Sequence, residues 1–146
     1  MKKNNLELDF HFLDLGSDQI KKMMKFVPLL IPPSGSWIRD CELYAFQKDP
    51  CLSLKFHKES DDTSWDIYFE DYVAFKITCH EFAVHLICSK QMPNQGAFFY
   101  IENSPWLNEL KKVDRPEILD NCKHYVLFFY DEVVEVISND LKFKKN

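Results

Sequence analysis

The sequence predicts a single α+β domain over residues 1–146, in which a mostly antiparallel sheet carries two main helices and a C-terminal β-hairpin lies at the centre of the sheet. Short stretches of alternating apolar and polar residues recur along the chain, and short polar turns separate them. This pattern is typical of antiparallel strands. Two other segments space their apolar residues at the period of a helix. Strands joined by short turns, with helices packed on one side, form an α+β domain.

The clearest strand signal is the C-terminal hairpin, expected at residues 125–137. Residues 125–130 read Tyr-Val-Leu-Phe-Phe-Tyr, and a second apolar run follows the acidic pair Asp131-Glu132. Because successive side chains of a strand point to opposite faces, residues 125–130 are apolar on both faces. Such a strand has to be covered on both sides, so we place the hairpin in the interior of the sheet. The lysines that follow are expected to trail into solvent: Lys142, Lys144 and Lys145.

Two helices are expected outside the hairpin. The first lies between Ser17, a capping residue, and Pro28, which limits how far a helix can run. The second opens at Ser104-Pro105, a capping residue with proline at the first helical position, and its apolar stripe extends to Val113. Alternation predicts the other strands at residues 6–12, 37–46, 51–56, 65–69, 72–77, 82–88 and 97–101.

One predicted strand, residues 72–77, carries most of its apolar side chains on a single face. Val73, Phe75 and Ile77 are two residues apart, so all three are expected to face the core. A hydrophobic content of 46% over 146 residues is sufficient for one such core.

Negative charge is concentrated in the middle of the chain. The net charge is −5, and residues 40–81 alone carry ten acidic and four basic residues, a net −6. An acidic segment repels phosphate backbones, so we expect no nucleic-acid partner. It could guide a basic protein partner, since charge complementarity raises association rates. The alternative is a solvated surface that keeps the protein soluble.

The sequence favours a cytosolic protein without a membrane segment. Its five cysteines show no disulfide-framework spacing, which is consistent with free thiols in a reducing compartment. The first residues lack the apolar stretch of a signal peptide. The longest apolar run, residues 26–33, is interrupted by proline and is too short to span a bilayer.

A group of possible metal ligands lies at residues 79–88, but we expect no metal or other cofactor. Cys79 and His80 precede Glu81, and His85 and Cys88 follow. Zinc binds such residues, yet the two histidines are one residue too far apart for the zinc-protease helix motif. On a strand the four ligands would also point to both faces. No Gly-rich loop or nucleophile motif is present, so no catalytic residue is assigned.

A second possibility is a small-ligand site or enzyme pocket between helices and sheet. Glu135 lies in an otherwise Val- and Ile-rich strand, and a carboxylate among apolar neighbours can have a shifted pKa. A pocket in which Glu81, His85 and Glu135 converge would favour this interpretation. Otherwise Glu135 faces water or accepts a hydrogen bond from His124 or a Trp indole.

The preferred interpretation is a protein interface on a sheet. Exposed tyrosines beside acidic residues are suited to protein binding. The predicted strands bring together six residues as a candidate partner-binding face: Tyr44, Asp66, Tyr68, Glu70, Asp71 and Tyr72.

Fragments between residues 65 and 138 resemble small bacterial cytosolic proteins, some of which are similar to immunity proteins of toxin systems. The resemblance is carried by Trp65-x-Ile67-x-Phe69, Ala74-Phe75-Lys76-Ile77 with Glu81, Ser104-x-Trp106-Leu107, His124-Tyr125-Val126 and Glu135-Val136-Ile137. It implies a non-enzymatic module whose partner is a toxin. We therefore expect the acidic and aromatic sheet face to cover the partner's active surface.

Overall fold

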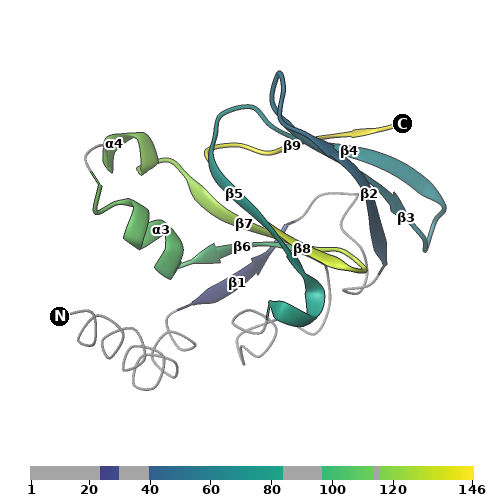
Figure 1. Cartoon of the computed structure of the whole chain (residues 1–146), viewed down its shortest axis with the longest axis horizontal. Helices are drawn as coiled ribbons and strands as arrows, with labels where there is room; N and C mark the ends of the chain where they lie inside the picture. Colours follow the sequence, from purple (N-terminus) through teal and green to yellow (C-terminus); the bar gives the residue numbers. More distant parts are fainter. Residues whose placement is uncertain (1–23, 30–39, 84–96, 114–115) are drawn as a thin grey trace.

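Two antiparallel sheets face each other across the core (Figure 1). The structure is a computed structural model and describes residues 24–29, 40–83, 97–113 and 116–146. The five-stranded sheet has the strand order β1 (Lys25–Pro28), β6 (Phe98–Glu102), β7 (Lys123–Phe128), β8 (Glu132–Ser138) and β5 (Tyr72–Cys79). The four-stranded sheet has the order β2 (Cys41–Gln47), β3 (Leu52–Lys58), β4 (Thr63–Phe69) and β9 (Lys142–Lys145).

The prediction that the C-terminal hairpin lies inside a sheet is confirmed. Strand β7 has β6 on one side and β8 on the other, and β8 in turn pairs with β5. Residues Tyr125–Phe129 are all buried. Tyr125 and Leu127 point into the core between the sheets, whereas Val126 and Phe128 belong to a cluster on the opposite face.

The core between the sheets is built from the alternating positions of both. Strands β3 and β4 contribute one side, and β6, β7 and β8 the other. Phe56 of β3 contacts the rings of Phe98 and Phe129, with centroids 5.3 and 5.6 Å apart. Edge-to-face and tilted ring pairs of this kind add to the stabilisation from apolar burial.

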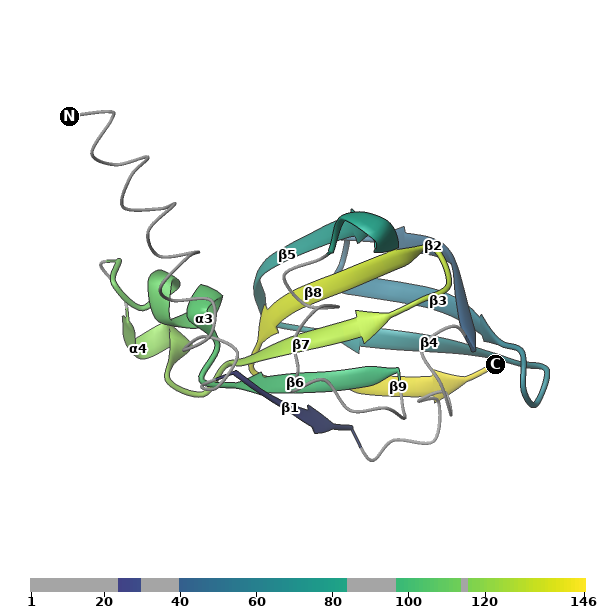
Figure 2. The same cartoon turned by 90° about the horizontal axis from the view of Figure 1, so that it is seen from below.

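The outer face of the five-stranded sheet carries two apolar clusters in the described part of the chain. In the first, Met24 and Phe26 of the β1 segment pack with Val126 and Phe128, together with Ala83 after a 3-10 turn, His80–Phe82. Helices α3 (Pro105–Leu110) and α4 (Pro116–Leu119) cover another part at one end of the sheet, as Figure 2 shows. Among the described residues, no helix is long and apolar enough to cross a bilayer.

The prediction of two main helices is not confirmed. In the described ranges, α3 has six residues and α4 four. The first predicted helix cannot reach Pro28, because Lys25–Pro28 pairs with β6 as a strand and buries Phe26. The rest of that helix and the predicted strand 6–12 lie outside the described residues. In the second helix, Leu107 is buried and Val113 is exposed, so the apolar stripe is shorter than predicted.

Three further predictions were wrong in part. Lys142, Lys144 and Lys145 are exposed as predicted, but residues 142–145 form β9 on β4, and Phe143 packs against the Trp65 ring. Val73 is exposed because the register between β5 and β8 shifts between Tyr72 and Ala74, although Phe75 and Ile77 do contact the core. Phe82 lies in the 3-10 turn and is exposed. The remainder of the predicted strand 82–88 lies outside the described residues.

The outer-face packing predicts unequal effects of one substitution at two isoleucines. Ile137 of β8 is fully buried beneath α3 and α4, whereas Ile118 of α4 is exposed. We expect Ile137→Ala to lower the free energy of unfolding by about 2–5 kcal/mol. Ile118→Ala should change it by about 0.5 kcal/mol or less. Urea unfolding followed by circular dichroism measures both, and equal effects would contradict this packing.

Candidate functional site

A buried polar network, formed by Ser104, His124 and Glu135, lies on the outer face of the five-stranded sheet. His124 Nδ1 is 2.6 Å from Ser104 Oγ, and His124 Nε2 is 2.8 Å from Glu135 Oε1. The three residues are 2%, 3% and 1% exposed. His124 and Glu135 reach the same face because β7 and β8 pair with Val126 opposite Glu135. Polar groups this deeply buried need partners, and His124 here joins Ser104 to Glu135.

Neighbouring elements extend this network to helix α3 and strand β5. Ser104 is the N-cap of α3 and accepts a hydrogen bond from Leu107 N at 3.1 Å. Lys76 Nζ of β5 lies 3.6 Å from Glu135 Oε2 and 4.4 Å from the centre of the Trp106 ring. The edge of Trp106 also meets His124. The network therefore fixes the start of α3 against three strands.

The order of donors resembles that of a nucleophile, base and carboxylate triad. An ionised Glu135 can only accept, so His124 Nε2–H donates to it. In the neutral imidazole, Nδ1 then accepts the Ser104 hydroxyl proton, as the base does in a serine hydrolase. However, Ser104 Oγ is buried and already caps a helix. Its contacts favour a role in holding α3 over a role in attacking a substrate.

The predicted pocket residues are not brought together by the described contacts. Glu135 lies opposite Lys76, whereas Glu81 is exposed in the 3-10 turn beyond the end of β5. His85 lies outside the described residues. The alternative, that Glu135 accepts a hydrogen bond from His124, is confirmed.

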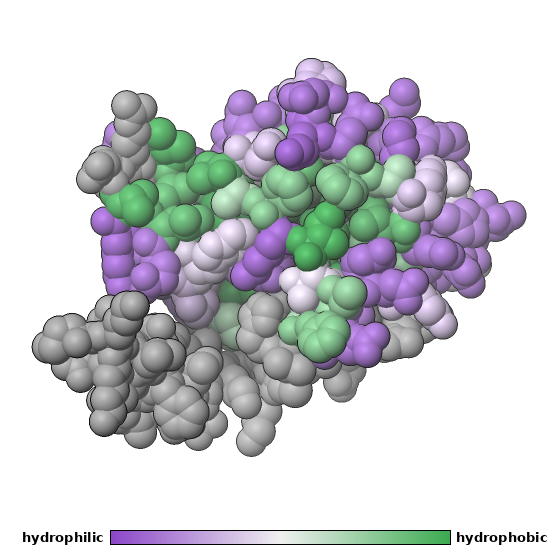
Figure 3. Space-filling model, in the orientation of Figure 1, coloured by the Kyte–Doolittle hydropathy of each residue, from purple (hydrophilic) through white to green (hydrophobic). Residues whose placement is uncertain are grey.

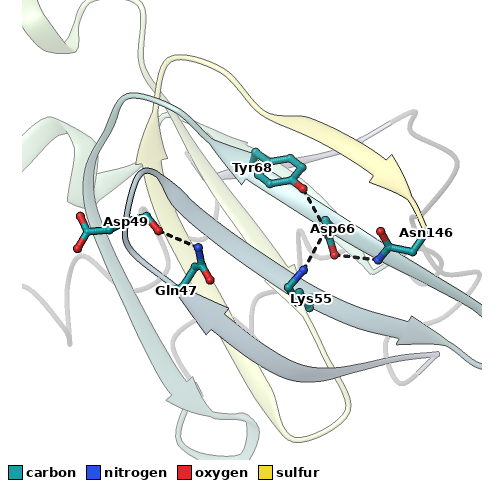
Figure 4. A network of polar contacts seen from close by, with 6 residues as sticks. All are labelled: Gln47, Asp49, Lys55, Asp66, Tyr68 and Asn146. Atoms are coloured by element: carbon teal, nitrogen blue, oxygen red, sulfur yellow. Dashed lines mark hydrogen bonds and ion pairs between the residues drawn. The ribbon is translucent and has the colours of Figure 1, made fainter.

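Asp66 of β4, one of the six predicted partner-binding residues, is buried on the outer face of the four-stranded sheet. Figure 4 shows three side chains converging on it. Lys55 and Tyr68 donate to Asp66 Oδ2 at 3.1 and 3.0 Å, and Asn146 donates to Oδ1 at 3.0 Å. Burial alone would raise the pKa of Asp66, but the hydrogen bonds from Asn146, Lys55 and Tyr68 outweigh it and hold the pKa below its ordinary value.

Of the other predicted partner-binding residues, Tyr68 lies on the same face of β4 as Asp66, and the remaining four lie on other elements. Tyr44 of β2 is exposed, and so are Glu70 and Asp71 in the turn between β4 and β5. Glu70 pairs with Lys142 of β9 at 3.0 Å. Tyr72 is half-buried on the five-stranded sheet, where it packs against Phe75. Two of the three carboxylates thus form ion pairs with lysines, and one of these lysines lies on a strand that the sequence did not predict.

An exposed apolar band along β5 and β2 was missed at the sequence level. Phe46 of β2 is 51% exposed and Val73 of β5 is 40% exposed. The Phe46 and Phe75 rings are 6.5 Å apart, which joins the edges of the two sheets. Figure 3 shows an apolar band crossing this face between hydrophilic margins. We define the apolar band by six residues: Leu43, Phe46, Tyr72, Val73, Phe75 and Ile77.

The sequence did contain a signal for this band. Residues 72–79 read Tyr-Val-Ala-Phe-Lys-Ile-Thr-Cys, a strand-forming run with a single charge. We assigned its apolar side chains to the core, because alternation does not distinguish an interior strand from an edge strand.

Comparisons with protein-family models, with curated proteins and with solved structures found no match. Within the described ranges, no group of three or more His, Cys, Asp or Glu side chains is placed to hold a metal ion. The predicted cluster is only partly described, since His85 and Cys88 lie outside those ranges.

Removing the Ser104 hydroxyl should loosen helix α3. Ser104→Ala removes the hydroxyl that Leu107 N–H and His124 Nδ1 contact, so we expect a loss of about 1–3 kcal/mol in the free energy of unfolding. The amide hydrogen of Leu107 should exchange faster with solvent. Ser64→Ala is the matched control, because the Ser64 hydroxyl makes none of these contacts. Unchanged stability together with unchanged Leu107 exchange would refute this role.

Asp66 should make stability depend on acid pH. The pKa of Asp66 in the folded state lies below its ordinary value of 3.8. The carboxylate therefore contributes fully to the free energy of unfolding above pH 3.8, and this contribution is lost as the pH falls through the folded-state pKa. Asp66→Asn should therefore be less stable than the original chain at neutral pH, and the difference should shrink below pH 3.8. Urea unfolding at several pH values measures this, with exposed Asp120→Asn as control. A difference that is constant with pH would be inconsistent with the contacts of Asp66.

Proposed function

We propose that this domain is a non-enzymatic protein-binding module of the cytosol, and that the apolar band is its binding surface. The observation that carries this proposal is the exposure of Phe46 and Val73 beside half-buried Phe75. Contiguous apolar surface with a polar rim is typical of a protein interface. The partner suggested by the resemblance to immunity proteins is a toxin, which the domain would block by covering its active surface.

This proposal shifts the binding surface away from the acidic and aromatic face predicted from the sequence. Asp66 is buried and engaged by Lys55, and Glu70 is paired with Lys142. Removing either carboxylate from its lysine would cost interactions that a partner would have to replace. Tyr72 belongs to the apolar band, and Tyr44 and Asp71 lie on neighbouring exposed positions, so they remain candidates for its margin.

An enzyme or small-ligand site is the weaker alternative. Its strongest support is the triad-like order of Ser104, His124 and Glu135. Against it stands the use of Ser104 Oγ as a helix cap at 2% exposure, which leaves a reacting atom no approach. A nucleophile has to be reachable by the atom that it attacks.

Site-specific photo-crosslinking in the native cell tests the binding surface. A photoreactive phenylalanine analogue at Phe46 or Val73 should give a crosslinked species that contains one defined partner protein. The same analogue at Ile118 or Val113 should not, because these exposed apolar residues lie on and beside the helices.

Two results would contradict the proposal. Crosslinks from Ile118 or Val113 alone would place the interface at the helices. If the variant carrying both Phe46→Ser and Val73→Ser still blocked the partner protein fully, with its folded state preserved, the apolar band would not be the surface that binds it.

A further inference from the structure

Strand β5 ends the five-stranded sheet. Within the described part of the chain it pairs only with β8, and none of its residues is fully buried. By contrast, the hairpin formed by β7 and β8 is almost entirely buried. An edge strand presents unpaired backbone N–H and C=O groups that another strand can bind.

The usual protection of an edge strand is weak along most of β5. A bulge lies between Tyr72 and Ala74, but Ala74–Cys79 pairs with β8 in unbroken register. That stretch contains no proline, and its single charge, Lys76, is turned to Glu135 and the Trp106 ring on the outer face. Proline and charges directed along the edge are what normally prevent strand addition.

Carboxylates gather at both ends of this edge. At one end, Cys79 lies opposite Glu132, whose pKa is raised by burial and further by the charges of Asp131 and Glu42. In the described residues, no lysine or arginine forms an ion pair with these three carboxylates. At the other end are three more carboxylates near one ammonium group: Glu70, Asp71 and Asp140 around Lys142.

We propose that the edge formed by Ala74–Cys79 binds an extended segment of a protein partner by strand addition, and that this segment is apolar in its middle and carries Lys or Arg at both ends. The inference rests on the proposed function, because it uses the same surface. Backbone hydrogen bonds to β5 provide affinity, and side chains on one face of the added strand pack against Phe46 and Phe75. The acidic ends select basic flanks.

A second copy of this chain does not suit the same edge. Two β5 strands related by a two-fold axis pair antiparallel, so the Tyr72 end of one copy meets the Cys79 end of the other. Each end is acidic, and like charges brought together at an interface are unfavourable.

Synthetic peptides test the inference directly. Three probes share a Thr-Val-Thr-Val-Thr-Val centre: one flanked by two lysines on each side, one flanked by glutamates, and one lysine-flanked with alternate backbone nitrogens methylated. We expect the lysine-flanked peptide to bind at least about tenfold more tightly than the glutamate-flanked one, and more weakly as salt is added. N-methylation should abolish binding, because it removes backbone donors. Amide shifts in NMR spectra of the whole chain should be largest in β5.

A matched pair of variants tests the acidic end. Glu42→Gln, Asp131→Asn and Glu132→Gln together should weaken binding of the lysine-flanked peptide several-fold. The control makes the same change in net charge near the helices and should leave peptide binding unchanged: Glu109→Gln, Glu117→Gln and Asp120→Asn.

Three outcomes would overturn the inference: no binding of the lysine-flanked peptide, equal binding of the N-methylated or glutamate-flanked probe, or concentration-dependent self-association through β5. If photo-crosslinking at Val73 still captures a partner in those cases, the apolar band stands as a binding surface and strand addition is rejected. If peptides bind β5 while cellular crosslinks arise only from the helices, strand addition holds as a property of the edge and the proposed function fails.

Discussion

The fold depends on the burial of strand β7 on both faces. Tyr125 and Leu127 need cover on one side, and Val126 and Phe128 need it on the other. The four-stranded sheet covers the first face as a complete second layer. Within the described residues, Val126 and Phe128 cluster on the second face with Met24, Phe26 and Ala83, and two short helices pack beside them.

The polar network on that second face explains how so short a helix is held in place. Six residues are too few for an isolated helix to be stable. Ser104 binds the backbone of α3 through Leu107 and binds the sheet through His124, so one hydroxyl group joins the two. Burying Glu135 is costly, but His124 and Lys76 offset that cost in the native arrangement only. The network therefore specifies where α3 sits as well as stabilising it.

The sequence predictions were correct where neighbouring residues determine the structure, and wrong where residues far apart in the chain determine it. The hairpin could be predicted because its two apolar runs, and the short acidic turn between them, are adjacent in the sequence. The predicted helix up to Pro28 was wrong because Phe26 pairs in a strand with Ile101, a residue far along the chain. Strand β9 was missed because the three lysines around Phe143 indicate a solvated tail, whereas its pairing with β4 and the contact of Phe143 with Trp65 depend on residues far away in the chain. The ion pair between Glu70 and Lys142 was missed for the same reason: the two residues are 72 positions apart, and no sequence pattern pairs them. Glu135 could be singled out because a carboxylate among valines needs a partner nearby, and His124 is one such partner in the structure.

Lys76 takes part both in anchoring helix α3 and in setting the charge along the edge of β5. On most edge strands a lysine in this position would extend along the edge and discourage another strand. Here its ammonium group is drawn to Glu135 and stacked on Trp106, so the contacts that anchor α3 also remove the one charge from the centre of β5. What remains is an apolar middle with carboxylates at both ends. This charge distribution, in a chain of net charge −5, is why we propose that a strand added to β5 carries basic flanks.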